Sequence, residues 1–170
     1  KGFEDLVNAL AILNRREDKF ALAIVGRDST RLVDTAKNTG VGESFFPLPV
    51  VASEPESSGG TFPSRDLIDL YRAADHFILP SYLETYANVA LESMAAGTPV
   101  IVTDVPGCRD TVVDGVDGLI VPSNSPGAIA AAIERIGYDS PLRSRLVGGG
   151  LEKASAQDWA SIAKRYAAEY

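Results

Sequence analysis

The 170-residue sequence contains one cysteine, Cys108, and one histidine, His76. A single cysteine excludes an intrachain disulfide and fits a reducing compartment. A lone histidine has no second ligand nearby in the sequence, so we expect no metal site. The low numbers of cysteine and histidine residues argue against a disulfide-stabilised or a metal-dependent protein.

Positive charge is also scarce, with 16 Lys and Arg residues against 23 Asp and Glu residues, and a formal net charge of −7. This balance is unfavourable for binding a nucleic-acid backbone, so we expect no nucleic-acid partner. No run of 18 or more apolar residues and no basic-then-apolar leader occurs. The chain as given is therefore expected neither to span a membrane nor to carry a signal peptide, and its length fits one domain.

Short apolar runs alternate with helical patterns along most of the chain. Strands are expected at 21–25, 45–48, 77–79, 100–102 and 118–122, and helices at 3–13, 30–37, 64–74 and 86–96. Residues 51–63 are rich in Ser, Gly, Pro and Glu and are expected to form a loop. Further helices are expected at 128–136, 141–153 and 155–170. This order favours a doubly wound parallel sheet covered by helices.

Glu84 and Glu92 lie where the strand at 77–79 leads into the helix at 86–96. Glu84 is predicted in the connecting loop and Glu92 one to two turns into the helix. Open parallel sheets bind ligands at the carboxyl ends of their strands, so both carboxylates are expected at a binding edge.

The start of this helix is a predicted anion site because its first backbone N–H groups lack helical acceptors. The expected donors are the amides of Tyr86, Ala87, Asn88 and Val89. Phosphate or diphosphate is the natural guest, and carboxylates beside it would accept hydrogen bonds from neutral hydroxyls. A diphosphate next to a polyhydroxyl group indicates a nucleotide sugar. The alternative is an ordinary solvated helix face, because Thr85, Asn88 and Glu92 fall at helical spacing.

Several motifs then occur in a characteristic order between residues 66 and 131. They are Asp69–Asp75 (DLYRAAD), Leu79–Ser81 (LPS), Glu84–Glu92, Ala96–Ile101 (AGTPVI) and Gly107–Pro122. Together they resemble the nucleotide-sugar-binding C-terminal domain of family 4 retaining glycosyltransferases of GT-B fold. The resemblance implies a Rossmann-like three-layer α/β/α domain over residues 1–170 that binds the donor, with the acceptor domain absent.

The resemblance implies transfer of a hexose from a nucleoside diphosphate sugar, without a metal or another cofactor. The acceptor, a sugar or a lipid-linked sugar, would be held by the missing N-terminal domain, in surface polysaccharide or glycolipid synthesis. The enzyme would be cytoplasmic, with any peripheral contact with the inner membrane made by the absent half. The isolated fragment would bind donor weakly and transfer nothing.

The resemblance also implies roles for individual residues. Lys1 and Gly26 would join the helix amides in holding the donor, and Glu92 would accept hydrogen bonds from the ribose hydroxyls. Glu84 would be the catalytic residue near the transferred sugar. Lesser candidates are Arg27 for the diphosphate, Val50 near the base, and Arg109.

Two differences from the family's usual sequence pattern leave other interpretations open. The family usually has Gly-Phe-Gly after the first glutamate, whereas this chain has Thr85-Tyr86-Ala87, and the lost glycines remove easy access to positive φ. Arg27 stands where the family often has a second glycine. The alternatives are a GT-B nucleotide-sugar epimerase and a non-catalytic nucleotide-binding or regulatory module.

The sequence begins at Lys1 rather than at a methionine. In the resembled family this Lys-Gly pair follows a central strand of the sheet. We therefore predict that the chain is part of a longer polypeptide and that its sheet has an opening beside the strand at 21–25.

Overall fold

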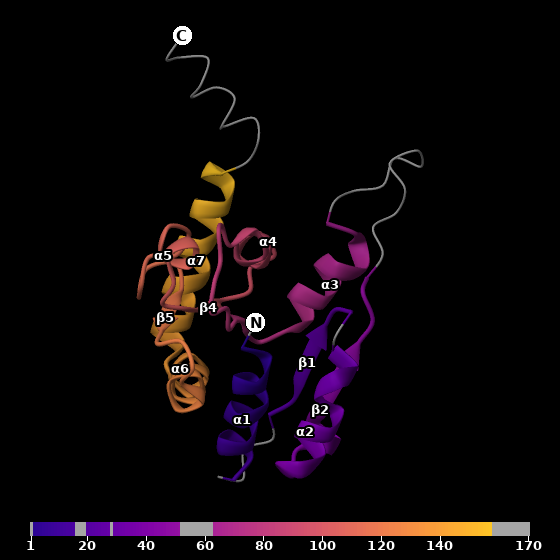
Figure 1. Ribbon diagram of the computed structural model, residues 1–170. Coiled ribbons are helices and arrows are strands. Elements are labelled where there is room, and N and C mark those ends of the chain that lie inside the picture. The colour runs from indigo at the N-terminus through magenta and orange to yellow at the C-terminus, as the bar shows by residue number, and fades with distance from the viewer. Residues whose placement is uncertain (1, 16–19, 28, 52–62, 158–170) are drawn as a thin grey trace, which may run out of the picture.

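The computed structural model describes residues 2–15, 20–27, 29–51 and 63–157 (Figure 1). Its helices are α1 (Phe3–Asn14), α2 (Val33–Asn38), α3 (Arg65–Ala73), α4 (Asn88–Ala95), α5 (Pro106–Arg109), α6 (Pro126–Tyr138) and α7 (Ser140–Ala156). Its strands are β1 (Leu22–Val25), β2 (Phe45–Leu48), β3 (Phe77–Leu79), β4 (Val100–Thr103) and β5 (Leu119–Val121). Two 3-10 helices, η1 (Ser29–Leu32) and η2 (Gly42–Ser44), precede α2 and β2. The predicted alternation of strands and helices is confirmed.

Local sequence explains where several helices begin and which side they bury. The Ser64 hydroxyl accepts a hydrogen bond from the Leu67 amide at 3.4 Å, as an N-cap residue does, and α3 starts at the next residue. In α1, Leu6, Leu10 and Leu13 recur at helical spacing and are all buried.

Every strand pairing in the described residues is parallel. β1 pairs with β2, and β4 lies between β3 and β5. β4 is buried on both faces, as central strands of parallel sheets are. Ile101 joins a core cluster with α1 and α6, whereas its neighbours Val100 and Val102 join a second cluster with α4.

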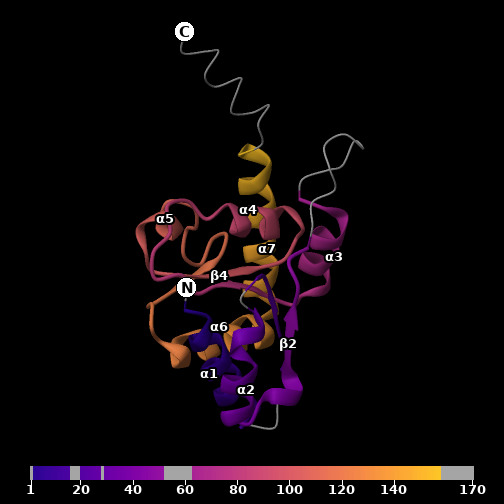
Figure 2. The ribbon, with the colours of Figure 1, turned by 45° about the vertical axis from the view of Figure 1, so that its right-hand side comes forward.

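The two clusters define the layers of the fold. α1 packs against α6 on one face of the sheet, and α4 packs against α7 on the other (Figures 1 and 2). α7 closes the edge between the layers, because Leu146 belongs to the first cluster while Gly150 lies against Met94 of the second. The α/β/α layering predicted from the sequence is present.

The strands form two separate groups rather than one continuous sheet. Among the described residues, β1 pairs only with β2, and β3 pairs only with β4. Figure 1 shows the pair β1–β2 on one side and β4–β5 on the other, with the start of α1 between them. The predicted opening beside β1 is therefore present.

Several helix boundaries differ from the sequence prediction. The helix expected at 30–37 is divided into η1 and α2, and α6 is two residues longer at each end than the predicted 128–136. α4 begins at Asn88 rather than near Tyr86, because Ala87 leaves the helical region with a ψ of 61°. α7 continues to Ala156, so the predicted break near residue 154 is wrong; no proline interrupts this stretch. The rest of the last predicted helix, and most of the predicted 51–63 loop, lie outside the described residues. No helix in the described part of the chain is long and apolar enough to cross a membrane.

Candidate functional site

The carboxyl ends of β3 and β4 carry the residues singled out from the sequence. β3 ends at Leu79, and the chain then forms a loop that contains Glu84 before α4 starts at Asn88. β4 ends at Thr103 and leads into α5, which packs behind this loop. Parallel strands present their carboxyl ends at one edge, so the loop, α5 and the start of α4 meet there.

Glu84 is half-buried and is held by short-range hydrogen bonds. Its Oε2 accepts from the Ser81 hydroxyl at 3.3 Å, and its Oε1 accepts from the Thr85 amide at 3.1 Å. Ser81 is 1% exposed, so the donor of the first bond is fixed in the interior. The carboxylate is thus oriented by its own loop while remaining accessible from one side.

Gly107 in α5 supports this loop from behind. A Cβ atom at Gly107 would lie 2.4 Å from the Glu84 carbonyl oxygen and 2.5 Å from the Thr85 carbonyl carbon. Only glycine allows this approach without displacing one of the two segments. Burial raises the pKa of the neighbouring Cys108 thiol, and the nearby Glu84 carboxylate raises it further.

The four amides predicted as anion donors fall into two pairs. The Ala87 amide donates to Thr111 Oγ1 at 3.3 Å, and the Asn88 amide donates to the Tyr86 carbonyl at 3.0 Å. The amides of Tyr86 and Val89 have no hydrogen-bond acceptor within the described part of the chain. Two of the four donors are therefore open to a ligand in this conformation, and two already have acceptors.

Glu92 lies just over one turn into α4 and is tied to α3. The Tyr71 hydroxyl donates a hydrogen bond to Glu92 Oε2 at 2.9 Å. Burial raises the pKa of Tyr71, and the Glu92 carboxylate raises it further, so this tyrosine stays a donor. Oε1 of Glu92 has no partner among the described residues and is available to an incoming hydroxyl.

The remaining predicted site residues are placed as follows. Lys1 lies outside the described residues, but the adjacent Gly2 is buried against the loop at Pro80. Gly26 follows β1 with a φ of 148°, and its amide donates to the Leu48 carbonyl at 3.2 Å. Arg27 is exposed. Arg109 forms a 2.7 Å ion pair with Asp104 in which both side chains are about half exposed, at 52% and 50%.

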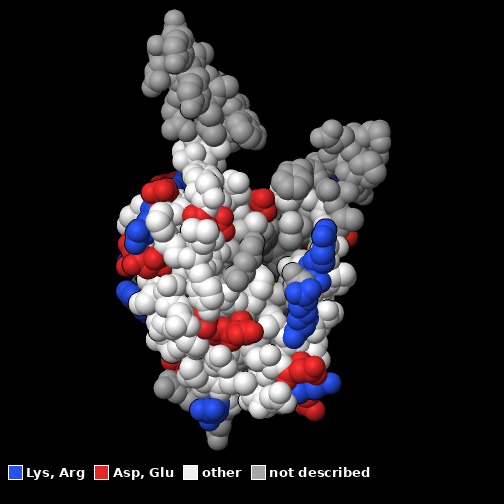
Figure 3. Space-filling model, in the orientation of Figure 1, with Lys and Arg blue, Asp and Glu red and all other residues white. Residues whose placement is uncertain are grey.

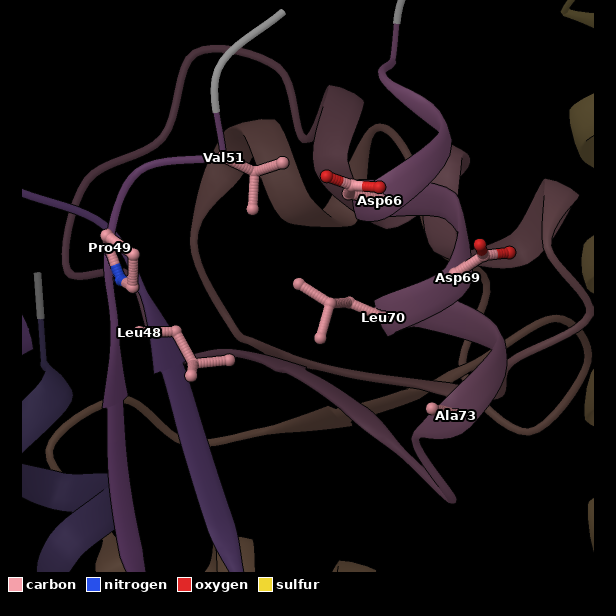
Figure 4. A pocket seen from close by; sticks show the side chains of 7 residues that line it. All are labelled: Leu48, Pro49, Val51, Asp66, Asp69, Leu70 and Ala73. Atoms are coloured by element: carbon pink, nitrogen blue, oxygen red, sulfur yellow. The ribbon is translucent and has the colours of Figure 1, made fainter.

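A groove with a volume of about 480 Å³ opens between the end of β2 and α3 (Figure 4). Its lining is mostly apolar and consists of Leu48, Pro49, Val51, Leu70 and Ala73, together with the carboxylates Asp66 and Asp69. In Figure 4, Asp66 extends toward Val51 across the groove. Val50, which the sequence placed near a base, is 57% exposed beside this groove and is not part of its lining.

Within the described ranges, no group of three or more His, Cys, Asp or Glu residues could hold a metal ion. Figure 3 shows both Lys and Arg side chains (blue) and Asp and Glu side chains (red) on this face of the molecule. In α3, Arg65 and Arg72 are both exposed.

Sequence reasoning missed three residues that shape the site: Tyr71, Thr111 and Tyr82. Tyr71 donates a hydrogen bond to Glu92, and Thr111 accepts one from the Ala87 amide. Tyr82 donates a hydrogen bond to Asp5 in α1. Tyr71 lies in the DLYRAAD motif (Asp69–Asp75), and this motif is the one sequence feature that could have indicated its role at the site. The partners are 21, 24 and 77 residues apart, so no local pattern could pair them.

A family model and the curated relatives of this chain both indicate glycosyl transferases. Residues 1–152 match the family described as "Glycosyl transferases group 1". The chain is 32% identical over 170 residues to a D-inositol 3-phosphate glycosyltransferase of Frankia alni, covering 94% of this chain and 39% of that protein. The chain spans well under half the length of the curated relatives that it matches here.

Solved structures share the fold over nearly the whole chain. A crystal structure of Anabaena Alr3699/HepE in complex with UDP and glucose has a TM-score of 0.83 at 21% identity, covering 99% of this chain and 44% of that one. A sucrose-phosphate synthase from Thermosynechococcus elongatus has a TM-score of 0.79 at 29% identity, covering 100% of this chain and 41% of that one.

Proposed function

Since the chain belongs to the group 1 glycosyl transferases, we propose that it forms the nucleotide-sugar-binding half of a retaining hexosyltransferase. The observation that carries this proposal is that two oriented carboxylates, Glu84 and Glu92, flank along the chain the amides of Tyr86 and Val89, which have no acceptor among the described residues. A diphosphate fits the amides, and sugar hydroxyls fit the carboxylates. A nucleotide sugar supplies both in one molecule.

Glu92 would bind the ribose of the donor. Its Oε1 has no partner among the described residues and can accept hydrogen bonds, while Tyr71 holds Oε2 and fixes the side chain. A carboxylate that is already oriented loses less conformational freedom when it binds a hydroxyl, so affinity rises. Tyr71 acts through Glu92 and does not itself need to touch the donor.

The diphosphate would lie at the start of α4. The amides of Tyr86 and Val89 have no acceptor there among the described residues, and the helix dipole favours negative charge. Lys1 would add an ammonium group, a compact charge suited to a phosphate. These groups would stabilise the diphosphate as it leaves, which is the main electrostatic demand of this transfer.

Glu84 would face the transferred hexose near its anomeric carbon. Its hydrogen bonds with Ser81 and Thr85 hold it as an oriented acceptor rather than as a mobile nucleophile. In the proposed reaction the acceptor attacks from the side of the leaving diphosphate, which takes the acceptor proton, so the configuration is retained. Glu84 stabilises positive charge that develops on the sugar.

The nucleobase would occupy the groove between β2 and α3. Its apolar walls, Leu48, Pro49 and Leu70, suit the face of an aromatic base. The groove adjoins α3, which carries Tyr71 and thereby reaches Glu92, so base and ribose would bind to the same helix. One solved protein with this fold, Anabaena Alr3699/HepE at 21% identity, was crystallised in complex with UDP-glucose and in complex with UDP, which makes a uridine nucleotide the first candidate.

The acceptor would be held by a part of the protein outside this chain. The chain spans 39% of its Frankia alni relative, so the larger remaining part of such a protein would supply the second domain of the enzyme. A sugar or lipid-linked sugar acceptor, a cytoplasmic location and metal-independent donor binding all belong to this proposal.

Calorimetric titration of the full-length protein with UDP, GDP and ADP in the presence of EDTA tests the proposal. We expect one nucleotide to bind without metal, and Glu92→Ala to weaken it about tenfold, because a charged acceptor for the ribose is lost. Glu152→Ala, a matched change at an exposed position of α7, should bind like the wild type. Binding of none of the three nucleotides would contradict the proposal and favour a non-catalytic module.

A further inference from the structure

The loop that carries Glu84 is anchored to α1 by a hydrogen bond between Tyr82 and Asp5. The Tyr82 hydroxyl donates to Asp5 Oδ2 at 2.8 Å. This bond raises the pKa of Tyr82, with smaller contributions from burial and from the charges of Asp5 and Glu4. The tyrosine therefore stays protonated and keeps its role as donor.

Asp5 is an unusual residue to find in the interior. It is 6% exposed, although carboxylates are rarely buried without a partner. It lies in the first turn of α1, where the helix dipole favours negative charge. The Tyr82 hydroxyl supplies the side-chain hydrogen bond that offsets its desolvation.

A backbone contact reinforces the same anchor. Gly2 adopts a φ of 67°, and a Cβ atom there would lie 2.0 Å from the Pro80 carbonyl oxygen and 3.2 Å from a ring carbon of Tyr82. The start of α1 therefore packs directly on the first residues of the loop. Asp5 and Gly2 hold the loop at two adjacent points.

Two side chains in and just after the loop are exposed in the described structure. Leu83 is 83% exposed and Tyr86 is 40% exposed, so neither is locked by packing. The inner side is fixed through Ser81, which is buried, and through Gly107. Tyr82 lies two positions before Glu84. Its hydrogen bond to Asp5 connects the exposed part of the loop to α1.

We propose that Asp5 and Tyr82 are positioning residues that hold the 80–84 loop against α1 and so fix the place of Glu84 relative to the donor. This rests on the proposed role of Glu84 at the transferred sugar. Neither residue needs to touch the donor. Displacement of a reacting group by about 1 Å can cost a large factor in rate, so loss of the anchor should lower turnover more than binding.

The test compares Tyr82→Phe, Asp5→Asn and the double variant in the full-length protein. Phenylalanine keeps the ring and removes only the hydroxyl, while asparagine keeps an oxygen acceptor at residue 5. Tyr138→Phe removes a hydroxyl from a 70% exposed tyrosine at the end of α6 and serves as the control.

Hydrogen exchange gives the first readout. We expect amide exchange over residues 80–87 to quicken at least fivefold in Tyr82→Phe, less in Asp5→Asn, and not at all in Tyr138→Phe. Exchange in α6 should stay unchanged in Tyr82→Phe and Asp5→Asn. Unchanged exchange over residues 80–87 in Tyr82→Phe would overturn the proposal, whatever the activity.

Hydrolysis of UDP-, GDP- or ADP-glucose, with water as acceptor, gives the second readout. For the sugar that the wild type hydrolyses, we expect kcat to fall about tenfold in Tyr82→Phe, with KM within twofold. The double variant should match Tyr82→Phe, because both changes remove one interaction. An unchanged kcat, or a rise in KM alone, would overturn the proposal. Absence of hydrolysis by the wild type would contradict the function proposed above, while the exchange data would still decide whether the anchor exists.

Discussion

The hydroxyl of Tyr71 lies 2.9 Å from Oε2 of Glu92 and donates a hydrogen bond to it. This bond joins α3, which borders the β2 groove, to α4, which begins beside Glu84. The Tyr71 ring also makes an edge-to-face contact with Phe77, with centroids 5.5 Å apart. The carboxylate of Glu92 therefore has a defined orientation before any ligand binds.

Tyr71→Phe tests whether this orientation contributes to binding. The change keeps the contact with Phe77 and the backbone carbonyl that accepts from Thr98, and it removes only the hydroxyl. We expect the affinity for the preferred nucleoside diphosphate to fall about fivefold, or ~1 kcal/mol, because Glu92 must then be ordered on binding. Calorimetry of the full-length protein measures this.

An increase in affinity for Tyr71→Phe would give the opposite conclusion. It would mean that Tyr71 competes with the ligand for Oε2 of Glu92 instead of orienting it. Tyr138→Phe, at the far end of α6, is the matched control and should bind like the wild type.

His76 makes stability depend on pH in the acidic range. Its Nε2 is buried without a hydrogen-bond partner among the described residues. Burial lowers the pKa of His76 from its ordinary value of 6.5, and Arg143 lowers it further, while Asp75 acts in the opposite direction. Just below pH 6.5 the unfolded chain therefore binds a proton that the folded chain does not. The free energy of unfolding should fall as the pH falls through this window.

Two measurements check this prediction. His76 is the only histidine, so its ring resonance in an NMR titration is unambiguous and should have a midpoint below 6.5. Urea unfolding at pH 7.5 and 5.5 should show a smaller loss of stability for His76→Gln than for the wild type, because glutamine stays neutral. A midpoint at or above 6.5 would contradict the lowered pKa.

The sequence predicted the parts of the fold that depend on local patterns. The strand at 77–79 and the helix containing Glu92 follow from apolar runs and from the stop at Gly97. The opening beside β1 was also predicted, although only through the resemblance to a known family. A parallel sheet then places Glu84 and the start of α4 at the carboxyl ends of the strands, so this juxtaposition follows from the topology alone.

The fine structure of the site could not be predicted because it depends on tertiary contacts. The start of α4 has no side-chain cap, and Ala87 bonds instead to Thr111, 24 residues away. That bond moves the first helical residue to Asn88 and occupies one predicted donor amide. The Asp5–Tyr82 bond joins residues 77 apart, and nothing near either residue indicates the pairing.

Gly148 and Gly149, adjacent residues of α7, allow a matched test of how closely α7 packs against the rest of the fold. Gly148 is exposed, and a Cβ atom there would have no neighbour within 4 Å in the described part of the chain. A Cβ atom at Gly149 would lie 2.4 Å from the Val116 carbonyl oxygen. Alanine should therefore act in opposite directions at two consecutive positions of one helix.

We expect Gly148→Ala to raise the free energy of unfolding by about 0.5–1 kcal/mol, because alanine lowers the entropy of the unfolded chain and nothing obstructs its methyl group. Gly149→Ala should lower the free energy of unfolding by roughly 1–3 kcal/mol, because α7 must move away from the loop at Val116. Urea unfolding of both variants, with the m-value checked for constancy, measures the difference. Equal effects of the two substitutions would mean that α7 does not pack against this loop as described. Opposite signs would support the close contact that lets α7 join the two core layers.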